Sequence, residues 1–336
     1  MGSRLTPAAD LSGILPAVIS GGRPGLSQRC IWRLLPALEG VTAAPVWVVR
    51  EDQAADYEPD GHEVVTYGRD WAMEYAEPRW TDVMPYPGDG FTGAFPGREW
   101  ACREAERRGC WAVLQLDDNI RALYCFSAYG ASARSVALRG GLAMFADVLA
   151  AVTLATNARM TGAALGAANP SSEPTKFARA GFPYSLFLER TGEGRHEWFG
   201  PSEDDIIHGF QYGSDGTSGT AAIVIPLRYQ KDHFAAGGLR GWYDQSRSAG
   251  LQRLHPEGAK ITVHKRRANG RGTARVFHAM LPGAIKTPLI IRDRPRWEAA
   301  GQYLAELAED AAEAIHRDAK ARAARWAARP GAVRNG

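Results

Sequence analysis

The sequence has no strong excess of charge of either sign and little cysteine. It holds 40 Lys and Arg residues against 37 Asp and Glu residues, for a formal net charge of +3. Binding to nucleic acid through overall charge is therefore excluded, and any such role needs local clusters of basic residues. The spacing of the cysteines matches neither a zinc site nor a disulfide scaffold. They are Cys30, Cys102, Cys110 and Cys125. We therefore expect a protein of the reducing cytoplasm.

The sequence also lacks a long hydrophobic run. No apolar segment approaches the ~20 residues that a helix needs to cross a bilayer, and the N-terminus shows no basic region followed by an apolar signal core. We expect a protein that is neither membrane-bound nor exported. What the sequence does have is 336 residues, of which 45% are hydrophobic. This is enough for a well-packed core in one large or two small domains.

The first half of the chain alternates between short apolar segments and helical ones. Apolar runs bounded by Gly, Pro or charged residues predict buried strands at 14–20, 45–50, 64–67 and 111–116. Helical patterns are predicted at 27–38 and 97–108. Between 68 and 97, aromatic residues, Pro and Gly dominate without a clear period, which predicts a long ordered loop. This alternation predicts the α/β class, with a mainly parallel central sheet flanked by helices.

The second half mixes both kinds of element. Helices are predicted at 135–155 and 202–209, and strands at 162–168, 184–189 and 220–229. A long C-terminal helical pattern runs from about 296 to 329. Acids lie near its start and Arg residues near its end, an order that complements the helix dipole and needs no functional explanation.

Two adjacent carboxylates and an amide follow the predicted strand at 111–116. Asp117, Asp118 and Asn119 stand at the carboxyl end of a strand, where ligands of open α/β sheets bind. Because neighbouring like charges repel, a hard cation such as Mg²⁺ or Mn²⁺ would stabilise them and could also bind diphosphate oxygens. A sugar nucleotide carries such a diphosphate, and a metal stabilises its growing charge as the sugar leaves. The alternative is an ordinary turn, in which Asp and Asn are common.

A second acidic cluster consists of Glu203, Asp204 and Asp205. It follows Ser202, which can cap a helix, and a helix start is ordinarily a place for acids. Alternatively, at least one of these carboxylates faces a cleft and acts as general base on an acceptor hydroxyl. We favour Asp204 for this role, with Glu203 and Asp205 as close competitors.

Three further segments are candidates for the same site. Donor-binding residues are expected after the first strand, where backbone N–H groups and a guanidinium can approach a nucleotide: Ser20, Gly21, Gly22 and Arg23. The stretch 233–244 places Gly237 and Gly238 among aromatic residues, which suits packing against a sugar ring or a tight loop pinned to the core. His264, on a predicted strand, either completes the metal site or is structural.

Taken in chain order, these segments resemble a GT-A glycosyltransferase. They are Gly21-Gly22-Arg23 after the first strand, the strand ending in Leu116-Asp117-Asp118-Asn119, and Glu203-Asp204-Asp205. More narrowly, residues 114–120, together with Arg98 and Arg103 on the preceding helix, resemble the TET-associated glycosyltransferases of phages. The resemblance covers roughly residues 12 to 290. We expect a GT-A-like domain at 1–292, with 293–336 as a C-terminal helix and tail that pack on it or extend from it.

The resemblance implies transfer of a sugar from a uridine diphosphate (UDP) donor to the hydroxyl of 5-hydroxymethylcytosine in DNA. Asp117 and Asp118 then form the metal and donor site, and Glu203 and Asp204 supply the candidate base. An Asp-Asp-Asn sequence stands where GT-A enzymes more commonly have Asp-X-Asp. This difference leaves open which of Asp117, Asp118 and Asn119 contacts the metal directly.

A DNA acceptor requires clustered basic residues with few acids. Such a cluster surrounds a predicted hairpin tip, with Lys265, Arg266, Arg267 and Arg271 as candidate DNA-binding residues. A solvated basic hairpin is the alternative. A base modified inside a duplex must also leave the stack, and the Trp- and Tyr-rich segment 71–95 could hold it or could simply cover the core.

Several functions stay open on the sequence alone. The first is a metal-dependent glycosyltransferase acting on modified DNA. The others are a GT-A transferase with a protein, lipid or small-molecule acceptor, a non-enzymatic nucleic-acid-binding protein, and a metal-dependent nuclease with two clamped metals. No obligate protein partner is evident. For a transferase we expect direct displacement at the anomeric carbon, with a single inversion if Asp204 is the base.

Overall fold

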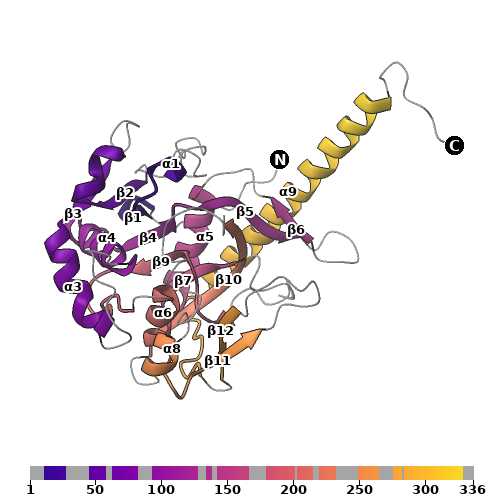
Figure 1. Cartoon of the computed structure of the whole chain (residues 1–336). Helices are drawn as coiled ribbons and strands as arrows, with labels where there is room; N and C mark the ends of the chain where they lie inside the picture. Colours follow the sequence, from indigo (N-terminus) through magenta and orange to yellow (C-terminus); the bar gives the residue numbers. More distant parts are fainter. Residues whose placement is uncertain are drawn as a thin grey trace.

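The computed structural model contains a large mixed sheet flanked by helices (Figure 1). Its ten strands have the order β3-β2-β1-β4-β9-β7-β10-β5-β6, and β8 pairs with β10. The structure describes residues 11–27, 45–57, 63–81, 93–127, 134–137, 142–165, 179–200, 203–214, 219–231, 249–264, 275–281 and 284–327. Within these residues, no helix is long and apolar enough to cross a membrane.

The N-terminal half of the sheet is parallel, as the alternation in the sequence predicted. It consists of β3 (Val64–Tyr67), β2 (Val46–Arg50), β1 (Ile14–Ile19) and β4 (Ala112–Asp117). Every residue of β1 is buried, which explains why its sequence is a continuous apolar run and does not alternate with polar residues. Beyond β4 the strand directions are mixed.

The second half of the sheet begins with β9 (Leu186–Arg190), which is antiparallel to both β4 and β7 (Ala158–Leu165). The strand β10 (Ala221–Lys231) is parallel to β7 and therefore runs in the same direction as β4. The strand β5 (Ile120–Ser127) lies between β10 and β6 (Arg134–Ala137), which is the edge strand at this end of the sheet. The short strand β8 (Arg179–Ala180) pairs with β10. A separate hairpin is formed by β11 (Ala259–His264) and β12 (Arg275–Met280).

Two hydrophobic clusters lie on opposite faces of the sheet. One contains side chains of α3 (Arg69–Thr81), α4 (Phe95–Arg107), α6 (Asp204–Ser214) and α8 (Ala249–Leu254). The other contains side chains of α5 (Leu142–Ala155) and α9 (Arg294–Ala327). The short elements are η1 (Leu11–Gly13), α1 (Pro24–Ser27) and η2 (Glu51–Asp56). The predicted α/β class, with a central sheet flanked by helices, is confirmed.

The long C-terminal helix is also confirmed. α9 has 34 residues; its first half contacts α5, β5 and β6, and its second half projects from the body (Figure 1). Near its start, Ala300 and Leu304 are buried in the core, whereas the residues described between 319 and 325 are exposed. The domain division at residue 292 stays a prediction.

Two predictions about local structure were wrong. The segment 68–97 is not a long loop, because its first half forms α3, whose Trp71 and Tyr75 stack on each other against α4. The segment 135–155 is not one helix, because its first residues pair with β5 as β6 and only the remainder forms α5. The strand β5, between β10 and β6, was not predicted. The predicted helix at 27–38 lies almost entirely outside the described residues.

Candidate active site

The carboxyl ends of β1 and β4 lie side by side and bring the first group of predicted residues together. In the parallel ladder Ile19 is paired with Asp117, so Ser20 and Asp118 follow at the same edge of the sheet. The hydroxyl of Ser20 donates to Oδ2 of Asp118 at 2.7 Å. Strand pairing thus makes this edge a single polar site, at the place where open α/β sheets bind their ligands.

The loop after β1 is fixed by contacts with η2. Gly22 has a φ of 63°, a left-handed conformation that favours glycine and turns the chain sharply. Its N–H donates to Oε1 of Gln53 at 2.9 Å, and the N–H of Arg23 donates to the hydroxyl of Tyr57 at 3.2 Å. The Tyr57 and Ser20 hydroxyls are also hydrogen-bonded, at 2.7 Å. The loop therefore presents Arg23 to the site in a defined position.

Asp117 is held between two cations. Its Oδ1 accepts from Nη2 of Arg98 at 2.8 Å, and its Oδ2 accepts from Nζ of Lys231 at 2.5 Å. Burial by itself raises the pKa of Asp117, but the charges of Lys231 and Arg98 outweigh it and hold the pKa well below its usual range. Both oxygens are engaged, so Asp117 organises the site but has little capacity left for a metal.

Asp118 is less fully compensated than its neighbour. Its Oδ1 lies 2.7 Å from Nη2 of Arg23, in an orientation that forms no hydrogen bond. Among the described residues, Oδ1 of Asp118 and Nε of Arg23 are both buried without a hydrogen-bond partner. Burial, and secondarily the charge of Asp117, raises the pKa of Asp118 to about 6. An acceptor and a donor are thus left next to each other at the edge of the sheet.

The second acidic cluster reaches the same site through α6. Nε of Arg98 donates to Oδ2 of Asp204 at 2.7 Å, so one guanidinium joins Asp204 to Asp117. Oδ2 of Asp205 accepts from the backbone N–H of Ser185 at 3.1 Å, and the Ser185 hydroxyl contacts Nζ of Lys231 at 2.6 Å. Burial, and then the charge of Asp204, raises the pKa of Asp205 to about 6.

The backbone at this junction is strained. Ser185 has a φ of 56° and Glu203 a φ of 57°, values that side chains other than glycine rarely adopt. The carbonyl of Glu203 accepts from the N–H groups of Ile206 and Ile207 and so starts α6. Such conformations cost of order 1–3 kcal/mol each and gather where a site needs a fixed geometry. The strain therefore supports a functional role for the start of α6.

The described residues fit a divalent cation at Asp118. Three basic groups face four carboxylates at this edge: Arg23, Arg98 and Lys231 against Asp117, Asp118, Asp204 and Asp205. The excess of acid, and the Asp118 oxygen without a hydrogen bond, suit an oxygen-seeking metal such as Mg²⁺ or Mn²⁺. Within the described part of the chain, no group of three or more His, Cys, Asp or Glu residues could hold a metal. A metal here would therefore need ligand oxygens to complete its shell.

Other predicted site residues are not brought to this edge by the described structure. His264 is the last residue of β11, and its side chain lies outside the description. Gly237 and Gly238 also lie outside the described residues, as do the candidate DNA-binding residues Lys265, Arg266, Arg267 and Arg271. Arg103 of α4 pairs with Glu99 at 2.9 Å and lies over the rings of Trp71 and Tyr75. The described aromatic residues of 71–95 pack in the core: Trp71, Tyr75, Trp80 and Phe95.

Three residues of the site were not identified from the sequence. Tyr57 and Ser185 carry no recognisable motif, because each reaches the site through tertiary contacts. Lys231 had a usable signal: it comes just after the predicted strand at 220–229, whose carboxyl end falls at the same edge as Asp117. A basic residue at that position is well placed to bind an anionic ligand or to neutralise an acid.

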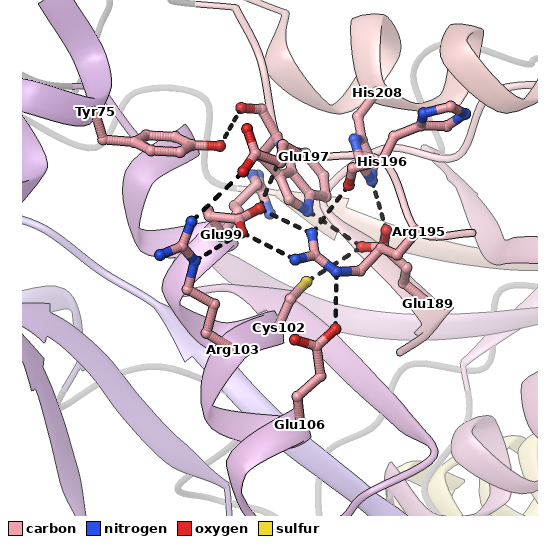
Figure 2. Close-up of polar contacts among 12 residues, drawn as sticks. Tyr75, Glu99, Cys102, Arg103, Glu106, Glu189, Arg195, His196, Glu197 and His208 are labelled. Carbon is pink, nitrogen blue, oxygen red and sulfur yellow. Dashed lines mark hydrogen bonds and ion pairs between the residues drawn. The ribbon is translucent and has the colours of Figure 1, made fainter. Parts of the chain in front are cut away.

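A buried polar network fixes the two helices that supply Arg98 and Asp204. We call it the Glu189 network (Figure 2). Glu189 of β9 contacts Nε2 of His208 on α6 at 2.6 Å, and Sγ of Cys102 on α4 lies 3.5 Å from its other oxygen. Glu99 of α4 is held by Arg195 through bonds of 2.8 and 2.9 Å. Because α4, β9 and α6 meet in this network, the Arg98 to Asp204 contact has a rigid support.

Comparisons with known proteins give a faint likeness of fold. No family profile matches the chain, and no curated protein matches it in sequence. Among solved structures, the chain is similar to a mycobacterial protein, with 10% identity over 82% of this chain and 85% of the other and a TM-score of 0.44. It is similar to glucosyl-3-phosphoglycerate synthase of M. tuberculosis, with 9% identity, coverages of 77% and 86% and a TM-score of 0.41. It is also similar to mannose-1-phosphate geranyltransferase of Thermus thermophilus, with 15% identity over 54% of this chain and 51% of the other and a TM-score of 0.24.

Proposed function

We propose that this protein is a metal-dependent glycosyltransferase that moves a sugar from a UDP-sugar to the hydroxyl of 5-hydroxymethylcytosine in DNA. The observation that carries the donor half of this proposal is the pairing of Asp118 and Arg23. Each has a buried polar atom without a hydrogen-bond partner among the described residues, one an acceptor and the other a donor. A diphosphate bound to a metal ion would supply a cation to the Asp118 oxygen and a phosphate oxygen to the Arg23 nitrogen.

The donor would be held by residues from three elements. Asp118, with Asn119 beside it, would hold Mg²⁺ or Mn²⁺, and the guanidinium of Arg23 would hold a phosphate oxygen. When bound, the metal stabilises negative charge on the leaving diphosphate. Asp117 keeps Arg98 and Lys231 in place through the two contacts described above, so that the positive charge of Lys231 stays at the same edge.

Of the three candidate bases, the structure favours Asp205. One oxygen of Asp204 already accepts a hydrogen bond from the buried Arg98. Asp205 is half-buried, and among the described residues it accepts only from the backbone N–H groups of Ser185 and Ile206. The pKa of Asp205, raised to about 6 by burial, is better matched to proton transfer near neutral pH than that of an ordinary carboxylate. We therefore assign the base to Asp205 in place of Asp204.

The reaction we propose is a direct displacement. Asp205 takes the proton of the acceptor hydroxyl, and the hydroxyl oxygen forms a bond to the anomeric carbon. The bond from that carbon to the diphosphate oxygen breaks, and its electron pair leaves with the diphosphate. A single displacement of this kind inverts the anomeric configuration, which the coupling constant of the product's anomeric proton will report.

The proposed identity of the acceptor rests on the sequence resemblance. The GT-A resemblance suggests a sugar transferase, and the narrower resemblance to the TET-associated enzymes suggests hydroxymethylated DNA. The basic residues expected to contact DNA, at 265–271, follow β11, the first strand of the β11–β12 hairpin. A protein, lipid or small-molecule acceptor would use the same donor chemistry. Mass spectrometry of the DNA distinguishes these acceptors from a DNA acceptor.

Isothermal titration calorimetry tests the donor half. We expect UDP-sugar binding that requires Mn²⁺ or Mg²⁺ and is weakened at least about tenfold in Asp118→Asn, which corresponds to ~1.4 kcal/mol. Asp70→Asn is the matched control, because Asp70 is an exposed acid on α3. Donor binding that is equally tight without metal, or in Asp118→Asn, would contradict the proposed site.

The acceptor half is tested separately by mass spectrometry. Hydroxymethylated and unmodified duplexes are incubated with the protein, Mn²⁺ and a panel of UDP-sugars. We expect a mass increase of one hexose or related sugar on the hydroxymethylated duplex alone. Slow metal-dependent hydrolysis of the donor with no DNA product would keep the transferase and reject the DNA acceptor, and cleavage of either duplex would indicate a nuclease.

A further inference from the structure

A second charged cluster lies at the opposite end of β4 from Asp117. Arg190, the last residue of β9, pairs with Ala112, the first residue of β4. The length of β4, Ala112–Asp117, places this cluster roughly 17 Å from the candidate active site along the strand. Three arginines meet there, and the function proposed above uses none of them: Arg159, Arg190 and Arg292.

Backbone pairing forces these side chains together. In the ladder between β7 and β9, Met160 is paired with Glu189, so Arg159 and Arg190 come next at the end of that ladder. Ile291 forms a bridge to Thr156, and the N–H of Arg292 donates to the carbonyl of Ala155 at 2.7 Å. Like charges brought together in neighbouring strands repel each other and destabilise the fold.

The described residues do not neutralise this positive charge. Arg159, only 8% exposed, donates Nη1 to the carbonyls of Arg190 and Thr191 at 3.5 and 3.2 Å and Nη2 to the carbonyl of Glu193. Its Nε is buried and has no acceptor among the described residues. The neighbouring acid Asp293 pairs instead with Arg296, at 3.0 Å.

Electrostatics agrees with this geometry. Burial lowers the pKa of Arg190, and the charges of Arg159 and Arg292 lower it further. No ion pair joins any of the three guanidiniums to an acid within the described part of the chain. Arg190 is half-buried and Arg292 is exposed, so a ligand can reach both from solvent.

We propose that Arg159, Arg190 and Arg292 form a binding site for a phosphate-type oxyanion. Guanidinium groups bind such anions through paired N–H donors; here Arg190 and Arg292 supply the contacts, and the buried Arg159 supplies additional positive charge. The ligand is either a free phosphate or nucleotide, or a phosphodiester group of a nucleic acid. The site does not depend on the transferase proposal, because it shares no residue with the Asp118 region.

Thermal unfolding in phosphate and in chloride, at matched ionic strength, tests the site. We expect phosphate to raise the unfolding temperature of the wild type, because a ligand that binds only the folded state stabilises it. Arg292→Gln and Arg190→Gln should lose this increase, whereas Arg69→Gln, at an exposed arginine of α3, should keep it. Arg292 is exposed, so its substitution leaves the core intact. Equal phosphate responses in Arg292→Gln and the wild type would overturn the proposal.

Titration with two probes then separates the sources of the phosphate. Inorganic phosphate is followed by calorimetry, and a short unmodified duplex by fluorescence anisotropy over a series of salt concentrations. Binding of the duplex that weakens at least about tenfold in Arg190→Gln, with a shallower salt dependence, indicates phosphodiester groups. A tenfold loss confined to inorganic phosphate indicates a small anion. Metal-dependent donor binding should be unchanged in both arginine variants, and unaltered binding of both probes contradicts the site.

Discussion

The acids of the Glu189 network and the acids of the candidate active site are buried or half-buried, but they differ in how fully their charge is compensated. In the network, burial by itself raises the pKa of Glu99 and of Glu189, yet Arg195 and His208 respectively outweigh it, and both pKa values lie below their usual range. In the candidate active site, the effect of burial outweighs that of the nearby basic groups and raises the pKa values of Asp118 and Asp205 to about 6. In the Glu189 network the acids have enough positively charged partners, whereas in the candidate active site the acids outnumber the basic groups.

The difference separates acids that stabilise the fold from acids that await a ligand. A buried carboxylate with its full set of partners makes the folded state rigid. One whose partners are incomplete destabilises the apo protein, and such a residue persists where binding or chemistry needs it. Two adjacent residues differ in this way: the charge of Asp117 is compensated by its partners, whereas that of Asp118 is not fully compensated. Three changes would break or sharpen this comparison.

The largest expected effect is that of Asp205→Asn on turnover. If Asp205 takes the proton of the acceptor, its loss should lower kcat by about 10²–10⁴-fold and leave donor binding almost unchanged. Asp204→Asn should instead reduce stability and disturb donor affinity, because it leaves Arg98 with one carboxylate fewer. Steady-state kinetics with varied donor and acceptor separates the two. A larger loss of kcat in Asp204→Asn would return the base to the residue that the sequence favoured.

The next effect concerns the compensated region. Glu189→Ala leaves His208, Tyr212 and the indole N–H of Trp198 without their shared acceptor. Breaking a buried charged network in this way should lower the free energy of unfolding by about 3–5 kcal/mol. Urea unfolding measures it, with Glu193→Ala at an exposed acid as the control. A loss no larger than that of the control would show that the network contributes little.

The sequence predicts the strands and the acids of this site better than it predicts their partners. Buried runs such as 14–19 and 112–117 have a local signature, since most residues of such a strand are apolar. The carboxyl end of a strand is then a place where ligands are expected, which is how Asp117 and Asp118 were identified. The strand β5 was not predicted, although residues 122–126 form an apolar run; it follows β4 after only two residues.

The partners could not be predicted because they come from distant segments. Arg98 reaches both Asp117 and Asp204, and Tyr57 reaches Ser20, only after the sheet has assembled. α3 escaped prediction for a related reason: its aromatic residues and Pro78 obscure any helical period, and packing of Trp71 and Tyr75 on α4 stabilises it. Which of two adjacent acids is compensated is likewise a property of tertiary structure.

The smallest expected effect is also the sharpest test of the comparison. Asp118→Asn should raise the free energy of unfolding of the apo protein at pH 7.5 by about 1–3 kcal/mol, because it removes a buried charge whose folded-state pKa is near 6. Asp117→Asn should lower the free energy of unfolding, because it removes the anion shared by Arg98 and Lys231. Urea unfolding at the same pH compares the two variants.

The pH dependence fixes the sign of this effect. The ordinary pKa of an Asp side chain is 3.8, and the folded-state pKa of Asp118 is about 6, so between these values the folded state binds more protons and stability falls as pH rises. The advantage of Asp118→Asn should therefore be absent near pH 4 and fully present above pH 7. Asp117 has the opposite shift, so its contribution is present above about pH 4 and disappears as the pH falls further. If Mn²⁺ and donor are added at pH 7.5, the wild type should gain stability that Asp118→Asn does not gain. The difference in the free energy of unfolding between the two proteins should therefore become smaller or change sign. An Asp118→Asn protein that is less stable than the wild type at pH 7.5 without ligands would show that this acid is already compensated, and the distinction between the two neighbouring carboxylates would then be lost.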